Sequence, residues 1–140
     1  MPKINFHFLD RNPTLANRKV LKLFIEQLFI KEKTGLESLS YIFCSDEYLL
    51  QVNKDFLKHD FYTDVITFDL SSTKETVGEV YISIDRVKEN AQTMGISFKN
   101  ELHRVIFHGA LHLCGYKDKT KADEASMRSK EDKYLNSYFQ

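Results

Sequence analysis

The stretch Asp64-Val-Ile-Thr-Phe-Asp-Leu70 is followed, across the polar segment Ser71–Thr76, by the stretch Glu79-Val-Tyr-Ile-Ser-Ile84. Both stretches are rich in β-branched and aromatic residues, which favour extended backbone. Because only a short polar loop separates them, we expect two neighbouring strands that pair in antiparallel fashion. This pair predicts a sheet near the middle of the chain, to which the remaining segments add.

Two segments before this pair show a strand-like pattern. Large apolar side chains recur at every second residue in 4–8 and in 39–43, which predicts half-buried strands. Between these segments, apolar residues from Val20 onward recur at helical spacing. That pattern predicts a helix that begins at Asn17 and stops before Gly35, a residue type that commonly ends helices.

Capping signals predict four more helices, because Ser, Thr and Asp side chains satisfy the free N–H groups at a helix start. The expected helices are one opened by Ser45 or Asp46 with Phe56 on its apolar face, one from Asp85 to Gly95, one from Ser97 to Gly115, and one opened by Thr120 with Asp123 that runs toward Tyr138.

The resulting order β-α-β-α-β-β-α-α-α predicts an α+β fold, with helices packed on a mixed sheet of about four strands. We expect one domain over residues 1–140, because a chain of 140 residues is the size of one domain. Its 42% hydrophobic and 13% aromatic residues are enough for a core. This composition excludes disordered, collagen-like and low-complexity proteins.

Charge and cysteine content restrict the class of protein further. Twenty basic residues balance twenty acidic ones, so no overall field attracts nucleic acid or acidic lipid, and a nucleic acid would need a local site. Cys44 and Cys114 lie in apolar runs, which indicates buried thiols in a reducing compartment. With no signal-peptide pattern over residues 1–9 and no long apolar run, we expect a cytoplasmic protein without membrane contact.

The segment His108-Gly-Ala-Leu-His112-Leu-Cys-Gly115-Tyr-Lys-Asp118 carries the chemistry. Histidines four residues apart lie on one helix face, about 6 Å apart along the axis. Gly115 allows the backbone to leave the helix in a left-handed turn, which would return Asp118 toward the imidazoles. The segment therefore predicts a metal site at the C-terminal end of a helix, with His108, His112 and Asp118 as ligands. The competing interpretations are a chance histidine pair and a solvated loop aspartate.

Three protein ligands with an open fourth position are typical of catalytic zinc sites, so we expect one Zn²⁺ per chain. Zinc in such a site lowers the pKa of a bound water toward about 7, and other divalent transition metals also suit two nitrogens and one oxygen. Gly109 stands where H-E-x-x-H peptidases carry their general base, which disfavours peptide hydrolysis, and we assign no general base. A glycine inside a helix costs about 1 kcal/mol relative to alanine, which indicates close approach of substrate or another backbone.

This segment resembles the signature H-G-x-L-H-L-x-G-Y-D-H of the YbeY family, with every fixed letter matching from His108 to Tyr116. The signature's aspartate is Lys117 here, and its third histidine is Asp118. Residues 63–68 resemble the family's T-D-V-L-S-F strand, and 78–83 its G-D-I-x-I-S strand. The likeness spans roughly residues 53–135.

The resemblance implies a metal-dependent endoribonuclease that cuts single-stranded RNA during rRNA maturation. It also implies contact with the small ribosomal subunit and with an Era-type GTPase. A family arginine that contacts RNA aligns with Leu57, so Lys54, Lys58 and His59 become the candidate phosphate contacts. Asp118 in place of histidine keeps a ligand but adds negative charge, which makes the bound metal a weaker Lewis acid.

Two other functions remain open: a ribosome-assembly or RNA-binding factor with a structural metal, and a metallohydrolase of another substrate. Asp64 and Thr67 either line a cleft or face solvent. We expect His7 and His103 to be structural, and the mixed charges over residues 128–133 to form a solvated face.

Overall fold

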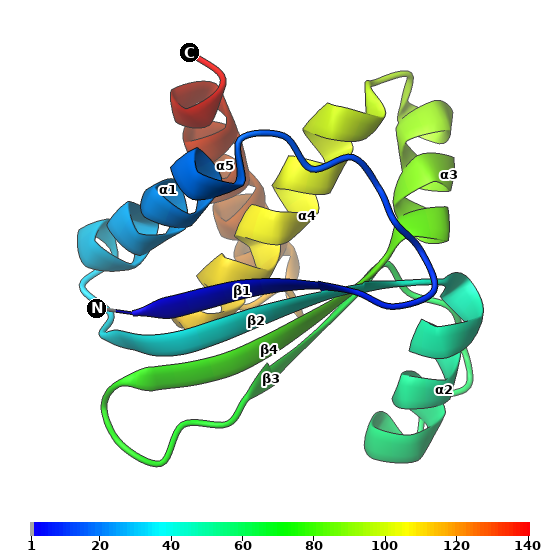
Figure 1. Ribbon diagram of the computed structural model, residues 1–140, viewed down its shortest axis with the longest axis horizontal. Helices are drawn as coiled ribbons and strands as arrows, with labels where there is room; N and C mark the ends of the chain where they lie inside the picture. The colour runs from blue at the N-terminus through cyan, green and yellow to red at the C-terminus, as the bar shows by residue number, and fades with distance from the viewer. Residues whose placement is uncertain (1) are drawn as a thin grey trace.

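The computed structural model of the chain describes residues 2–140; Met1, the first residue of the expected 1–140 domain, lies outside them. Strands and helices alternate at first and helices follow at the end (Figure 1). The elements, in order, are β1 (Lys3–Phe8), α1 (Arg18–Lys31), β2 (Leu36–Cys44), α2 (Asp46–Leu57), β3 (Val65–Asp69), β4 (Thr76–Ser83), α3 (Ile84–Met94), α4 (Phe98–Leu113) and α5 (Lys121–Tyr138).

The four strands form one mixed sheet in the order β1-β2-β4-β3. β1, β2 and β4 are parallel, and β3 is antiparallel to β4, with Thr67 opposite Val80. The structure thus confirms the predicted α+β class, the mixed sheet and the antiparallel pair. β3 forms one edge of the sheet and therefore has one side free of strand pairing.

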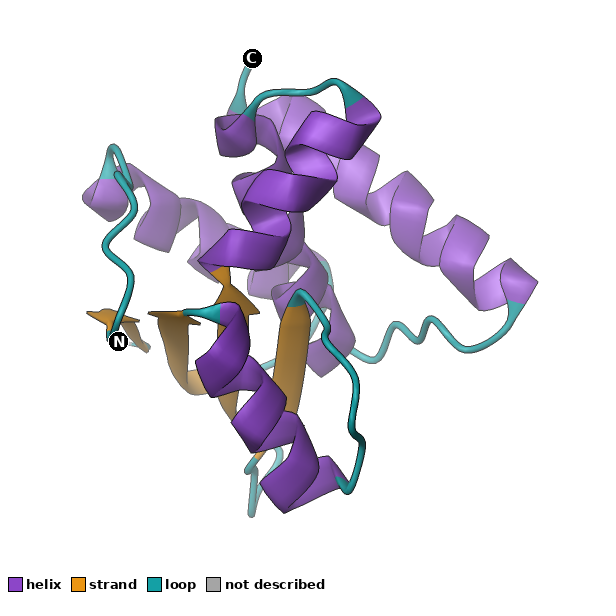
Figure 2. Ribbon diagram, turned by 90° about the vertical axis from the view of Figure 1, so that its right-hand side faces the viewer, coloured by secondary structure: helices purple, strands orange, loops and turns teal. Residues whose placement is uncertain are grey.

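The helices cover the two faces of the sheet unequally. α1, α4 and α5 lie on one face around the larger core, whereas α2 packs on the other face over a small cluster that includes Leu49 and Ile66 (Figures 1 and 2). α4 lies against both β3 and β4 and between α3 and α5. The helix that carries both candidate histidines is therefore the central helix of the fold.

Gly109 explains how closely α4 approaches the sheet. A Cβ atom built on Gly109 would lie 2.6 Å from Cγ1 of Val80, and one on Gly78 would lie 2.6 Å from Cδ1 of Leu113. Real Cβ atoms essentially never show contacts this short, so a side chain at Gly109 would force Val80 or the helix to shift, and one at Gly78 would force Leu113 to move. The close approach of another backbone that was expected at Gly109 is that of α4 to β4, where the Val80 side chain is the nearest neighbour of the glycine.

The helix starts follow the predicted caps with one exception. Ser45, Ser97 and Thr120 each accept a hydrogen bond from the backbone N–H three residues further on. Asp85 was wrongly expected to cap α3. Ser83 does so instead, and Asp85 lies in the first turn, where a carboxylate is favourable next to the helix dipole.

Some helix details also differ from expectation. α1 ends at Lys31, before Gly35 as expected, but the left-handed residue that follows the helix is Lys33 (φ 56°). Val20 and Phe56, expected on buried faces, are 57% and 69% exposed. No helix within residues 2–140 combines the length and hydropathy that crossing a bilayer requires.

Candidate metal centre

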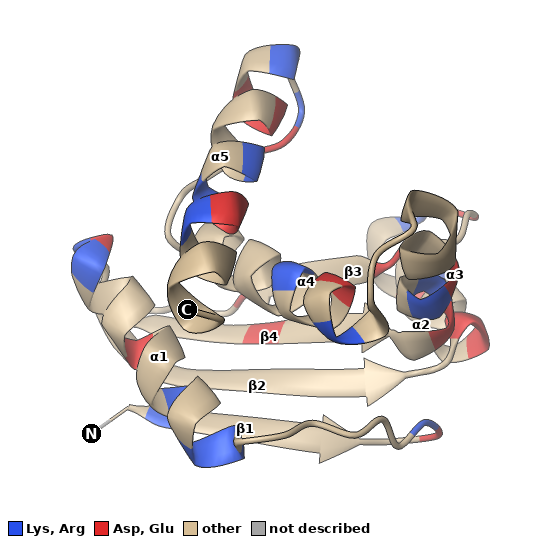
Figure 3. Cartoon of the chain, turned by 90° about the horizontal axis from the view of Figure 1, so that it is seen from above, with Lys and Arg blue, Asp and Glu red and all other residues tan. Residues whose placement is uncertain are grey.

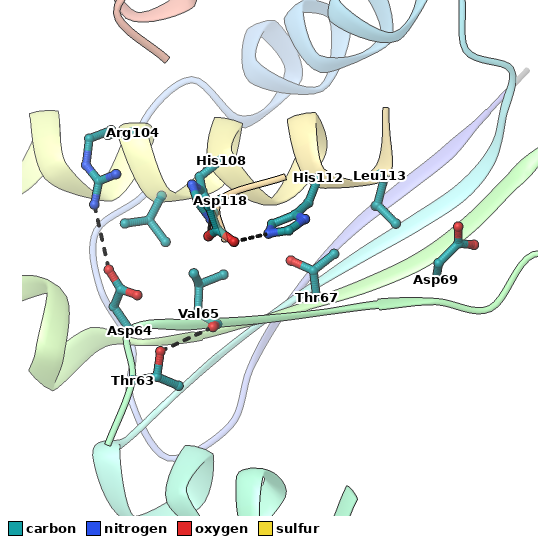
Figure 4. Close-up of a pocket in the computed structure, with 11 residues that line it drawn as sticks. Thr63, Asp64, Val65, Thr67, Asp69, Arg104, His108, His112, Leu113 and Asp118 are labelled. Carbon is teal, nitrogen blue, oxygen red and sulfur yellow. Dashed lines mark hydrogen bonds and ion pairs between the residues drawn. The ribbon is translucent and has the colours of Figure 1, made fainter. Parts of the chain in front are cut away.

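His108 and His112 lie one turn apart on α4, with ring centroids 5.2 Å apart. Each presents its Nε2 atom to Asp118: the distances are 3.4 Å from His108 to Oδ2 and 3.5 Å from His112 to Oδ1. One ligand atom from each residue lies within 4.8 Å of the other two (Figure 4). The structure therefore brings the three residues named from the sequence to one point.

The turn after α4 returns Asp118 to the helix. Gly115 adopts φ 103°, and the N–H of Tyr116 donates to the carbonyl of Leu111 at 3.1 Å, so the chain folds back over the last turn. The hydroxyl of Tyr116 then donates to Glu32 of the α1 end at 2.8 Å. This contact ties the loop to a second helix and fixes the path toward Asp118.

The three donor groups face a pocket of about 300 Å³ between α4 and the edge strand β3. His108 is 13% exposed, His112 33% and Asp118 41%, so a ligand in the pocket can reach all three. The lining residues are Thr63, Asp64, Val65, Thr67, Asp69, Arg104, Val105, His108, His112, Leu113 and Asp118 (Figure 4). Asp64 and Thr67 thus line the cleft, which was one of the two interpretations from the sequence.

A buried carboxylate holds the far side of His108. Nδ1 of His108 lies 2.6 Å from Oε2 of Glu131 on α5, whose side chain is only 2% exposed. The expectation that residues 128–133 form a solvated face was therefore wrong at Glu131. Met127 and Tyr134 are also buried, and their spacing of four and three residues from Glu131 is the signal that places all three on one helix face.

Arg104 connects this carboxylate to two others. Its guanidinium donates to Glu101 at 2.8 and 2.7 Å and to Glu131 at 3.0 Å, and it lies 3.7 Å from Asp64 on the pocket wall. Glu101 is fully buried and Glu131 nearly so. The charge-assisted hydrogen bonds with Arg104 compensate for removing these two carboxylates from water. Sequence reasoning missed Arg104, although it lies four residues before His108 on the same helix face.

The surroundings shift the protonation equilibria of several pocket groups. Burial alone would raise the pKa of Glu131, but the hydrogen bond with His108 and the charge of Arg104 outweigh burial and lower that pKa. Burial raises the pKa of Asp64 against the opposing charge of Arg104. Burial and then the neighbouring His108 lower the pKa of His112, which favours the neutral imidazole that a metal requires.

The other residues considered from the sequence lie away from this centre. Lys54, Lys58 and His59 belong to the end of α2 and the loop after it and do not line the pocket; Lys54 pairs with Asp60 at 3.4 Å. His103 is buried and stacks on Tyr138, with its Nδ1 2.7 Å from a backbone carbonyl, and His7 is exposed on β1. Burial raises the pKa of the free Cys114 thiol to about 12, so this thiol is a poor metal ligand.

The donor chemistry fits a transition-metal ion such as zinc. Two imidazole nitrogens and one carboxylate oxygen converge, the histidine nearer the core is held from behind by a carboxylate, and the front of the set opens to the pocket. The fold and this site define an α+β protein with a candidate catalytic metal centre at the end of its central helix.

Comparison with known proteins identifies the family. The family described as Endoribonuclease YbeY matches residues 8–139. The Endoribonuclease YbeY of Cytophaga hutchinsonii is 52% identical over 128 residues, covering 91% of this chain and 90% of that protein. That of Porphyromonas gingivalis strain W83 is 44% identical over 135 residues, covering 96% and 89%. The chain belongs to the YbeY family.

A solved structure agrees with this assignment. The solution structure of TM1509 from Thermotoga maritima superposes with a TM-score of 0.62 at 28% sequence identity. The match covers 96% of this chain and 89% of that one, so the two share their fold over nearly their whole length.

Proposed function

We propose that this protein is a metal-dependent endoribonuclease that hydrolyses phosphodiester bonds of single-stranded RNA during rRNA processing. The observation that supports it most is the convergence of His108, His112 and Asp118 on one point, open to a pocket, in a member of the YbeY family. The proposal treats residues 1–140 as one YbeY-like domain.

In this proposal His108, His112 and Asp118 hold one Zn²⁺ per chain. When bound, the metal supplies Lewis-acid polarisation and an acidified water at neutral pH. The two imidazoles contribute no charge when neutral, and Asp118 contributes one negative charge. With Zn²⁺ bound, the ion and these three ligands together have a net positive charge, which attracts the negatively charged phosphodiester.

The charge balance of the pocket gives the metal a second role. Asp64, Asp69 and Asp118 line the pocket with Arg104 as its one lining Lys or Arg, and that guanidinium is already paired with buried carboxylates. Without a cation, such a wall repels a phosphate. The binding of RNA in the pocket, and not only its cleavage, therefore depends on the metal.

Flexible single-stranded RNA suits this site better than a duplex, because an unpaired backbone can bend into a pocket. Thr67 on β3 lines the pocket, and its buried hydroxyl has no hydrogen-bond partner among the described residues. Lys54, Lys58 and His59, exposed beyond the pocket, are proposed contacts for the flanking phosphates. Their contribution should be salt-dependent.

Family membership supports the wider assignment. We propose rRNA as the substrate, the cytoplasm as the location, and the small ribosomal subunit and an Era-type GTPase as partners. An assembly factor with a structural metal is the second candidate, and a metallohydrolase of another substrate the third. The open front of the donor set favours a catalytic metal over a structural one.

The test compares His112→Ala with His7→Ala, which removes an exposed histidine on β1 far from the donor set. Metal content is measured on each purified protein, together with cleavage of a single-stranded RNA and the accumulation of unprocessed rRNA in cells. We expect His112→Ala to lose metal and cleavage, and His7→Ala to keep both. Metal-free protein with full processing would contradict the proposal, and metal retained with processing but without cleavage would favour the assembly factor.

A further inference from the structure

We propose that Glu131 is a positioning residue for the metal centre: by accepting a hydrogen bond from Nδ1 of His108, it holds Nε2 of that imidazole toward the metal position. This inference rests on the proposed metal centre described above. It assigns a role to a residue on α5, a helix that contributes no metal ligand in the proposed set.

The hydrogen bond determines which nitrogen of His108 is free. Oε2 of Glu131 lies 2.6 Å from Nδ1 of His108, and Oε1 of Glu131 accepts a hydrogen bond from Nη1 of Arg104 at 3.0 Å. The positive charge of Arg104, 3.0 Å from Oε1, favours the ionised carboxylate, which has no proton to donate, so the hydrogen of the shared bond lies on Nδ1. The lone pair of the neutral imidazole is then on Nε2, which is the atom that faces Asp118.

Burial makes this arrangement rigid. Glu131 is 2% exposed and its two oxygens are directed to two different partners, so the carboxylate cannot rotate without losing one of them. Leaving a buried charge without its partner costs several kcal/mol. The imidazole therefore stays in one orientation before any metal arrives. Outer carboxylates of this kind also increase the basicity of a ligating histidine.

Glu101 provides a matched control within the same cluster. Glu101 and Glu131 are both buried and both bind Arg104, but Glu131 alone of the two contacts His108. Removing the charge of Glu101 disturbs the ion cluster and leaves the imidazole hydrogen bond in place. Glu131→Gln keeps the shape of the side chain, and its neutral amide is a weaker acceptor that must turn an N–H₂ group toward one of its donors.

The experiment measures zinc affinity by competition with a chelator for the unaltered protein, Glu131→Gln and Glu101→Gln. Thermal unfolding of the metal-free proteins provides the control for folding. We expect Glu131→Gln to bind zinc about 10–100-fold more weakly, as for other outer-shell partners of ligating histidines. Glu101→Gln should bind zinc close to the unaltered affinity. Equal affinities for all three proteins, or equal losses in both variants, would overturn the positioning role.

A second readout needs no zinc and is made first on the unaltered protein. The Nδ1 proton of His108 should give a strongly deshielded resonance in NMR spectra of the unaltered protein, and Glu101→Gln should retain it. Its absence from the unaltered protein would overturn the inference, even where Glu131→Gln does not fold. If the unaltered protein binds no zinc, the proposed function fails, and this resonance alone decides whether Glu131 orients His108.

Discussion

Gly109 lies directly against Val80, so closely that a Cβ atom on the glycine would stand 2.6 Å from Cγ1 of the valine. The contact fixes the distance of α4 from β4. His108 is the residue before Gly109, so the same contact determines how far the candidate metal centre lies from the sheet and from the pocket wall on β3.

Gly109→Ala should therefore destabilise the protein, although alanine is the better helix former. We expect a loss of about 1–3 kcal/mol in the free energy of unfolding from overpacking, partly offset by about 1 kcal/mol of helix propensity. Denaturant unfolding measures the change, and the double variant Gly109→Ala/Val80→Ala should lose less than the sum of the losses of the two single variants, because alanine at position 80 leaves room for the new methyl group. A gain in stability for Gly109→Ala would show that the approach of α4 is not limited by Val80.

The buried Glu131 should make stability depend on pH. Its pKa is lowered in the folded state from an unfolded value near 4.5, so its contribution is present above that value and is lost as the pH falls through the folded-state pKa. Glu131→Gln should cost about 3 kcal/mol near neutral pH and progressively less in acid. Asp132→Asn, which removes the exposed neighbouring charge, should change the free energy of unfolding little, both near neutral pH and in acid. A constant deficit for Glu131→Gln at all pH values would contradict this account.

Metal removal should weaken RNA binding and not only cleavage, because the acidic groups of the pocket then face the phosphates without compensation. We expect chelated protein to bind a short single-stranded RNA markedly more weakly than zinc-loaded protein at the same ionic strength. Fluorescence anisotropy of a labelled oligonucleotide checks this expectation. Equal affinities would mean that RNA is held entirely outside the pocket, for example by Lys54 and Lys58.

Asp118 offers a way to change the charge at the metal. Asp118→His replaces an anionic donor with a neutral one, which raises the net positive charge of the centre and should shift the pH–rate profile of RNA cleavage toward lower pH. The comparison requires equal metal content in both proteins. An unchanged profile would indicate that Asp118 does not contact the metal during the reaction.

The features that the sequence predicted well depend on local spacing. Two histidines four residues apart, followed by a glycine that turns the chain, define the donor set without reference to the rest of the protein. The helix starts were equally predictable from the capping residues Ser45, Ser97 and Thr120, because capping involves only the next three residues. The antiparallel β3–β4 pair is equally local.

The features that were missed depend on contacts between distant segments. Glu131 stands among charged residues that are mostly exposed, and acidic and basic residues are mixed along α5 (Figure 3). Its burial follows only from the packing of α5 against α4, which brings Arg104 and His108 to it. The partner of Gly109 could not be identified for the same reason, because Val80 reaches it only in the folded sheet.

The central claim is that His108, His112 and Asp118 bind one metal ion together. An anomalous diffraction map of zinc-loaded crystals tests it most directly. We predict a single strong peak bonded to Nε2 of both histidines and to a carboxylate oxygen of Asp118 at about 2.0–2.2 Å. A peak elsewhere, or Asp118 turned into solvent with no peak beside the imidazoles, would contradict the account.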